Sequence, residues 1–180
     1  MAKASQKSRK SPKRLDPSRF TIEKATAKDC NRYISARSRV VYSYHVIKDK
    51  NNVSQIQQME KANSETQKLA RKLAETPENE FSKLMAYNVQ IFFFVRDSMD
   101  CGFSTVVLED QNTAYIGDLT VFNHLHGMGT LFYNMLETHL KSLGITKITL
   151  KAPFNGCKPF WRKMGFTPET DNSIVYEKFL

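Results

Sequence analysis

The spacing of apolar residues divides the first part of the chain into one strand and a set of helices. Apolar and polar residues alternate over 19–25, which predicts a short strand. The next apolar residues recur at the spacing of one helix face: Tyr33, Ala36, Val40 and Tyr44. A second amphipathic pattern covers 51–76. We therefore expect a helix that begins at Thr26 or near Lys28, and then one long or two shorter helices that end before Pro77.

The middle of the chain changes to runs of β-branched and aromatic residues. Three such runs follow one another: NVQIFFFVRD, CGFSTVVLED and NTAYIGDLTVF. The short segments between them predict an antiparallel meander. An amphipathic helix over 128–143 then ends at Gly144, and a strand over 145–152, a short helix and a last strand follow. We expect an α/β fold with a mixed, mainly antiparallel sheet flanked by helices, in which Leu119 and the strand over 145–150 diverge to leave a V-shaped slot.

The net charge of +9 lies mostly near the N-terminus. Residues 1–19 hold seven Lys or Arg against one Asp, which gives this segment +6 and leaves +3 for residues 20–180. The segment has few apolar residues, so we expect a disordered basic tail over 1–19 and one folded domain over 20–180. Such a tail suits either a weak contact with RNA, the ribosome or an acidic protein, or a solubilising role.

Composition also limits the compartment and the chemistry. The longest dense apolar run, Val89–Val95, is much shorter than the roughly 18 residues that span a bilayer, so we expect no membrane contact. Three cysteines without a CxxC pair favour a reducing cytoplasm over a disulfide scaffold. His124 and His126 have no carboxylate or cysteine at ligand spacing, so no metal site is expected.

Two glycines mark the start of the predicted helix over 128–143. Inside a helix glycine costs roughly 0.5–1 kcal/mol relative to alanine, so Gly127 and Gly129 indicate that something needs close access to the backbone. A helix N-terminus presents unpaired N–H groups and the positive end of the helix dipole, which together attract an anion. The nucleotide motifs GxxxxGK[ST] and GxGxxG are absent.

The segment DLTVFNHLHGMGTLFYNMLETHL, followed by ITKITLKA and FWRKMGF, resembles the GNAT N-acetyltransferase superfamily. Its phosphate loop reads Q/R-x-x-G-x-G/A, and a later motif reads N-x-x-A-x-x-F-Y-x-K-x-G-F. The resemblance covers 20–180 in element order and is specific over 115–166. It implies acetyl-coenzyme A as cosubstrate, with pantetheine on the main chain of a splayed strand and pyrophosphate on the glycine loop. By position, the residues at pantetheine are Leu119, Thr120 and Val121, and those at pyrophosphate are His126, Gly127, Met128, Gly129 and Thr130.

The sequence departs from the family pattern at two positions. His124 occupies the Q/R position, so an imidazole that is mostly neutral at pH 7 replaces an amide or guanidinium. Trp161 stands where many members carry a tyrosine proposed to protonate the leaving thiolate, and an indole N–H cannot do so at physiological pH. We interpret Trp161 as a core or cofactor-packing residue, and Asn155, near the asparagine of the motif, as a cofactor contact.

Direct acetyl transfer needs a base that makes the acceptor amine neutral. Asp118, beside the expected coenzyme strand, is the candidate base, and Glu109 and Asp110 are alternatives. The competing interpretation is that Asp118 only orders the end of its strand. The acceptor region holds residues that either flank a cation or form core: Tyr33, Tyr42, Tyr44 and His45. We expect an N-acetyltransferase acting on a primary amine. The alternatives are a catalytically silent acyl-coenzyme A-binding module and a nucleic-acid or ribosome binder.

Overall fold

One mixed sheet organises the part of the chain that the computed structural model describes, residues 15–40, 53–75, 77–122 and 127–180. The seven strands follow the spatial order β1-β2-β3-β4-β5-β7-β6. Their bounds are Phe20–Lys24 (β1), Val89–Arg96 (β2), Met99–Leu108 (β3), Thr113–Val121 (β4), Lys147–Lys151 (β5), Thr167–Pro168 (β6) and Val175–Phe179 (β7). Only β4 and β5 pair in parallel, which confirms the expected mixed, mainly antiparallel sheet.

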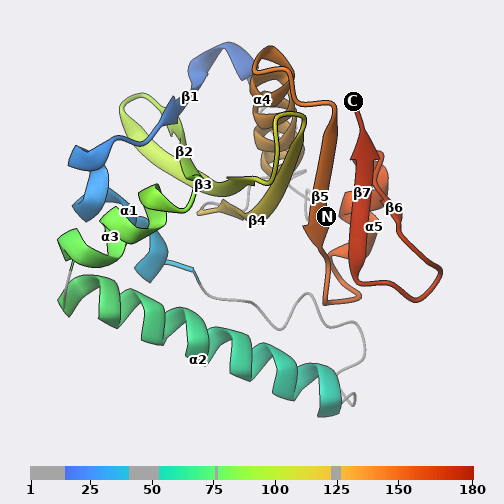
Figure 1. Ribbon diagram of the computed structural model, residues 1–180, viewed down its shortest axis with the longest axis horizontal. Helices are drawn as coiled ribbons and strands as arrows, with labels where there is room; N and C mark the ends of the chain where they lie inside the picture. The colour runs from blue at the N-terminus through green and yellow to red at the C-terminus, as the bar shows by residue number, and fades with distance from the viewer. Residues whose placement is uncertain (1–14, 41–52, 76, 123–126) are drawn as a thin grey trace, which may run out of the picture.

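Helices flank this sheet (Figure 1). The α-helices of the described residues are Cys30–Ser38 (α1), Val53–Glu75 (α2), Pro77–Ala86 (α3), Met128–Ser142 (α4) and Lys158–Lys163 (α5). Two short 3₁₀ turns, Pro17–Arg19 (η1) and Ala27–Asp29 (η2), precede β1 and α1. The long helix α2 contacts both α1 and α3 (Figure 1).

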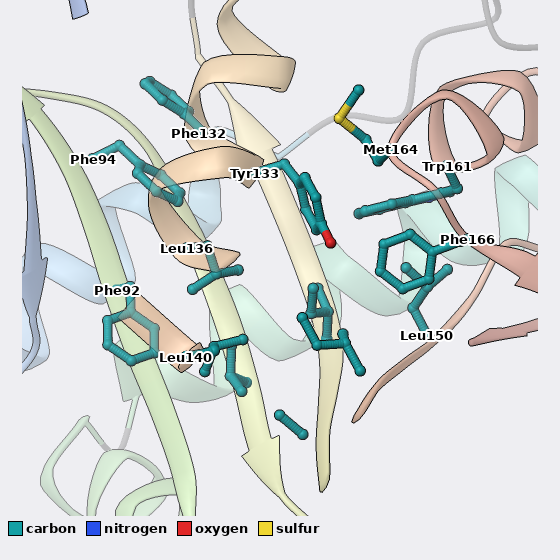
Figure 2. Close-up of a cluster of buried hydrophobic side chains, with 14 of the residues drawn as sticks. Phe92, Phe94, Phe132, Tyr133, Leu136, Leu140, Leu150, Trp161, Met164 and Phe166 are labelled. Carbon is teal, nitrogen blue, oxygen red and sulfur yellow. The ribbon is translucent and has the colours of Figure 1, made fainter. Parts of the chain in front are cut away.

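The strand β2, between β1 and β3, is apolar on both sides because each face of the sheet carries its own core. Phe92 and Phe94 join the cluster that contains α4 and α5, where the Phe94 ring stacks on Phe132 at a centroid distance of 4.3 Å (Figure 2). Ile91 and Phe93 face the opposite way, into the cluster that contains α1 and α3. The uninterrupted apolar run therefore follows from burial on both faces.

The element order predicted from the sequence is confirmed, with two additions. The prediction ended the helical region before Pro77, but Pro77 is the first residue of α3. Proline is tolerated in the first turn of a helix, because a backbone N–H there has no intrahelical partner to lose. Pro77 therefore begins a third helix directly after the second one. The two-residue strand β6 was also not predicted.

The helix α1 begins at Cys30 with Asp29 at its N-cap, so the second of the two predicted starts, near Lys28, is confirmed. Thr26 begins the turn η2 with a capping box, in which Asp29 accepts a hydrogen bond from the Thr26 backbone N–H at 2.8 Å. The helix continues to Ser38. Tyr42, Tyr44 and His45 lie outside the described residues.

The fold begins earlier than the boundary at residue 20 that the charge pattern indicated. Leu15 packs against the core cluster of α4, and Asp16 accepts a hydrogen bond from the Ser18 backbone at 3.1 Å to cap η1. Arg19 forms an ion pair with Asp97. The boundary shifts because a few local contacts hold residues that have a tail-like composition; residues 1–14 lie outside the described part. Among the described residues, no helix is both long enough and apolar enough to cross a membrane.

Candidate active site

The strands β4 and β5 separate at the middle of β4. They pair from Thr113 with Lys147 to Ile116 with Leu150, and no further. On its other side β4 stays paired with β3 as far as Val121, with an irregularity in register opposite Gly117. Such a bulge bends a strand and increases its twist. Residues 117–121 therefore run beside β3 with no pairing to β5, as the predicted divergence of the two strands requires.

The glycine loop lies beyond the same end of β4. Gly127 is the N-cap of α4 and has a φ of +88°, a left-handed conformation that favours glycine. Its carbonyl accepts the Leu131 N–H at 3.0 Å, so the helix begins directly behind it. A Cβ on Gly129 would lie 3.3 Å from the Phe160 ring of α5, so Gly129 lets the two helices approach closely. The first turn of α4 therefore presents backbone N–H groups without intrahelical partners, as an anion site requires.

The expected pyrophosphate residues differ in what they can offer. The Met128 side chain is only 2% exposed and belongs to the core, so its contribution to an anion is limited to the backbone N–H. Thr130 is partly exposed in the first turn of α4. His124 and His126 lie outside the described residues, and their contacts stay a prediction.

Asp118 lies on the splayed part of β4 and is held at three points. Its carboxylate Oδ2 accepts hydrogen bonds from Arg37 Nη1 at 2.7 Å and from Thr105 Oγ1 at 2.9 Å. Its carbonyl accepts the Ser104 hydroxyl at 2.6 Å. The candidate base is therefore a fixed carboxylate, half of an ion pair with Arg37 of the helix α1.

The other candidate carboxylates are occupied in the hairpin between β3 and β4. Asp110 accepts the backbone N–H groups of Asn112 and Thr113 at 2.7 and 2.6 Å. Glu109 accepts the Thr149 hydroxyl at 3.3 Å. Both lie at the paired end of β4, away from 117–121, so Asp118 is the better placed of the three.

Sequence analysis did not identify Arg37, Ser104 or Thr105 as site residues. Arg37 stands four residues after Tyr33, on the buried stripe of α1, and is only 8% exposed. A charged residue on an apolar helix face is the one signal that could have identified it. Nothing in the local sequence of Ser104 or Thr105 indicates that both would contact a residue of the next strand.

Tyr33 itself is a core residue. It is 2% exposed and its ring meets Phe103 edge to face at 5.8 Å, on the side of the sheet that carries α1. Burial raises the pKa of Tyr33 to about 12. Of the two interpretations of this aromatic residue, the core one is confirmed.

Trp161 packs inside the core between α4 and α5. It is 9% exposed, and its ring meets Phe166 at 5.3 Å and Tyr133 at 5.9 Å (Figure 2). Burial raises the pKa of Tyr133, and the neighbouring Glu137 carboxylate raises it further. Asn155 is exposed in the turn before α5. Neither Trp161 nor Tyr133 offers a proton to a thiolate at neutral pH.

No group of three or more His, Cys, Asp or Glu side chains in the described ranges could hold a metal ion. No disulfide joins the three cysteines, all of which lie in those ranges.

Comparison with known proteins places this architecture. No protein-family model and no curated protein sequence matches the chain. Among solved structures, the PaiA N-acetyltransferase of Thermoplasma acidophilum in complex with coenzyme A superposes with a TM-score of 0.62 and 20% identity, over 89% of this chain and 99% of that one. An acetyltransferase of Thermus thermophilus gives a TM-score of 0.60 at 13% identity, over 89% and 97% of the two chains. A GNAT-family acetyltransferase of Staphylococcus aureus gives 0.56 at 14%, over 89% and 99%.

These similarities extend over nearly the whole of each compared structure. At this level of identity they concern the fold. The chain therefore has the fold of the GNAT N-acetyltransferases.

Proposed function

We propose that the protein transfers the acetyl group of acetyl-coenzyme A to a primary amine by direct attack in a ternary complex. The observation that carries this proposal is the end of pairing between β4 and β5 at Ile116, in a chain that continues to the glycine-capped start of α4 at Gly127. The unpaired edge of 117–121 offers main-chain groups to the pantetheine amides, and the N-terminus of α4 offers N–H groups to the pyrophosphate. The compared structure of Thermoplasma acidophilum is a complex with coenzyme A, which supports the same ligand class here.

In the proposed reaction the amine nitrogen attacks the thioester carbonyl carbon. The C–S bond breaks, the nitrogen releases its surplus proton to solvent as the amide forms, and coenzyme A leaves as a thiolate that takes a proton from solvent. A thiol pKa near 8.5 makes this anion a tolerable leaving group, so no enzymatic acid is required at Trp161. Asp118 receives the proton that the acceptor ammonium loses.

Calorimetry of coenzyme A binding tests the glycine loop. We expect micromolar affinity for the wild-type protein and none for Gly127→Glu, because a carboxylate would repel the phosphates at the helix N-terminus. Gly127→Asn is the matched control, since asparagine tolerates the left-handed conformation and adds no charge. Undiminished binding by a folded Gly127→Glu protein would exclude the loop as the phosphate site.

A panel of amines tests the transfer step and searches for the acceptor. It includes lysine peptides, protein N-termini, polyamines and aminoglycosides, with release of free thiol as the signal. Asp118→Asn should lower turnover mainly below the pKa of the acceptor, where a base is needed to remove the ammonium proton. A wild-type pH dependence in this variant would place the base elsewhere.

A second candidate function is a catalytically silent module that binds acyl-coenzyme A. The specific observation in its favour is Trp161, which fills the core at the position where the family pattern has a tyrosine. Tight coenzyme A binding without thiol release from any amine in the panel would establish this function in place of the first.

A further inference from the structure

The ion pair between Arg37 and Asp118 joins the helix α1 to the splayed part of β4. Only 10% of the Arg37 side chain and 16% of the Asp118 side chain are exposed. Removing two charges from water is costly unless their geometry is good and further hydrogen bonds support them. Here the Nη1 to Oδ2 distance is 2.7 Å, and the Thr105 hydroxyl donates to the same oxygen.

The two carboxylate oxygens of Asp118 therefore have different surroundings. The bonds from Arg37 and Thr105 both end on Oδ2, and Ser104 fixes the carbonyl of the same residue. Oδ1 is consequently the oxygen available to an acceptor amine. The direction in which it points is set by residues of α1 and β3 that need not touch the substrate.

The charge of Arg37 has a second consequence for a bound amine. A guanidinium stays protonated throughout the accessible pH range, so Asp118 is neutralised by a partner that does not titrate. An isolated carboxylate would stabilise the ammonium form of the acceptor, which cannot attack a thioester. A permanent cation beside that carboxylate opposes this effect and favours the neutral amine, as neighbouring cations do for nucleophilic lysines.

We propose that Arg37 is a positioning residue for acetyl transfer, which orients the Asp118 carboxylate through Oδ2 and keeps it from holding the acceptor as an unreactive ammonium. This inference rests on the proposed function. It adds a residue of α1 to the transfer chemistry and gives the pair a role besides stability.

Among the described residues, two phenols feel the charges of the pair. From α1, Tyr33 has a pKa raised to about 12, mainly by burial, and the fields of Arg37 and Asp118 both reach it. From β4, Tyr115 has a pKa raised by burial and by the charges of Asp118 and Glu109. Both phenols stay neutral between pH 6 and 9, so neither contributes to a pH effect of Arg37 variants in this range.

The test is the pH dependence of kcat, which describes the enzyme with its substrates bound. It uses saturating acetyl-coenzyme A and the most active amine of the panel. For Arg37→Gln we expect the acid limb of the kcat profile to move up by about one pH unit, with a roughly tenfold loss of kcat at pH 7. The KM for the amine should fall at the same time, because an unneutralised Asp118 attracts the ammonium.

Two further variants separate this role from a structural one. Arg37→Lys keeps the positive charge, and should keep the wild-type acid limb while its kcat falls severalfold for lack of the planar fork. Arg32→Gln is the matched control. It removes an arginine of the same helix that pairs with Asp100 at 2.6 Å, and it should leave the kcat profile in place.

The outcomes distinguish the inference from the proposed function. A wild-type protein that releases no thiol with any amine overturns both. An active wild type with an unchanged acid limb in Arg37→Gln, or with KM and kcat both worsened and no shift, overturns the role of Arg37 alone. If Arg37→Gln does not fold, Arg37→Lys decides, since an acid limb displaced by about one pH unit in that variant contradicts a role based on charge.

Discussion

At the scale of single residues, Gly102 of β3 lies so close to β4 and α4 that no side chain fits there. A Cβ there would lie 2.2 Å from the Thr120 carbonyl oxygen and 2.8 Å from the Phe132 ring. The requirement is for space, because the φ of Gly102 is not positive. Gly144 has the opposite character, with a φ of +85° and no atom within 4 Å of a Cβ.

This contrast predicts two different costs for the same substitution. Gly102→Ala should lower the free energy of unfolding by more than about 3 kcal/mol, because backbone and a core ring must both move. Gly144→Ala should cost only about 1–2 kcal/mol, the strain of a left-handed residue with a side chain. Urea denaturation of both variants is the measurement, and equal midpoints would mean that the backbone of β3 yields easily at Gly102.

Sequence reasoning succeeded at the residue scale where the signal was local. Gly127 and Gly129 marked the start of a helix because both stand directly at the beginning of the amphipathic pattern over 128–143, where glycine lowers helix stability. It failed for Arg37 and Thr105, which contact Asp118 from 81 and 13 residues away along the chain. No periodicity or turn pattern encodes such pairs, because they depend on how the strands are placed in the sheet.

At the scale of elements, Trp161 shows how the helix α5 packs against the core. The sequence predicted this helix and the packing role of Trp161, but not its partner Tyr133 on α4, whose ring is perpendicular to it at 5.9 Å. The bulge that starts the slot opposite Gly117 was likewise not predicted, although the divergence of the strands was.

Trp161→Tyr should leave the acetyl transfer rate similar or raise it. The smaller ring leaves a gap against Phe166 and Tyr133, so the free energy of unfolding should fall by about 1–3 kcal/mol. Steady-state thiol release and urea denaturation measure the two effects. A large loss of rate with little change in stability would show that the indole contributes to the transfer step.

A second contact between elements predicts a pH dependence of stability. Glu137 of α4 accepts hydrogen bonds from Lys141 at 2.8 Å and from Lys178 of β7 at 2.5 Å. Burial alone raises the pKa of Glu137, but these two lysines lower it from 4.5 to about 2. Because the folded value lies below the unfolded one, the stabilisation is complete above pH 4.5 and is lost as the pH falls toward 2.

Glu137→Gln should therefore lower the free energy of unfolding at pH 7 by at most about 3 kcal/mol. The difference from the wild type should shrink between pH 5 and pH 2.5. Urea denaturation at a series of pH values measures it. A difference that stays constant over this range would mean that the charge of Glu137 contributes nothing to stability.

At the scale of the whole molecule, residues 1–19 carry +6 of the net charge of +9. The structure describes only 15–19 of this segment. The charge pattern alone placed the boundary at residue 20, but Leu15 packs on the core and its Cδ1 lies 3.4 Å from where a Cβ on Gly127 would be. Leu15, the first described residue, therefore lies beside Gly127. Whether the basic residues 1–14 bind RNA can be tested by truncation.

Two truncations should separate the basic segment from the part that belongs to the fold. Deleting residues 1–14 should leave the free energy of unfolding within about 0.5 kcal/mol of the full chain, since it removes charge and no known core contact. Deleting residues 1–19 also removes Leu15 from the core and the ion pair of Arg19 with Asp97, so the urea midpoint should fall.

If the segment contacts RNA, binding to single-stranded RNA should be weak in the full chain and should fall steeply with salt. It should disappear when residues 1–14 are deleted, because six Lys or Arg are lost with them. RNA binding that survives this deletion with the same salt dependence would place the contact on the folded domain instead.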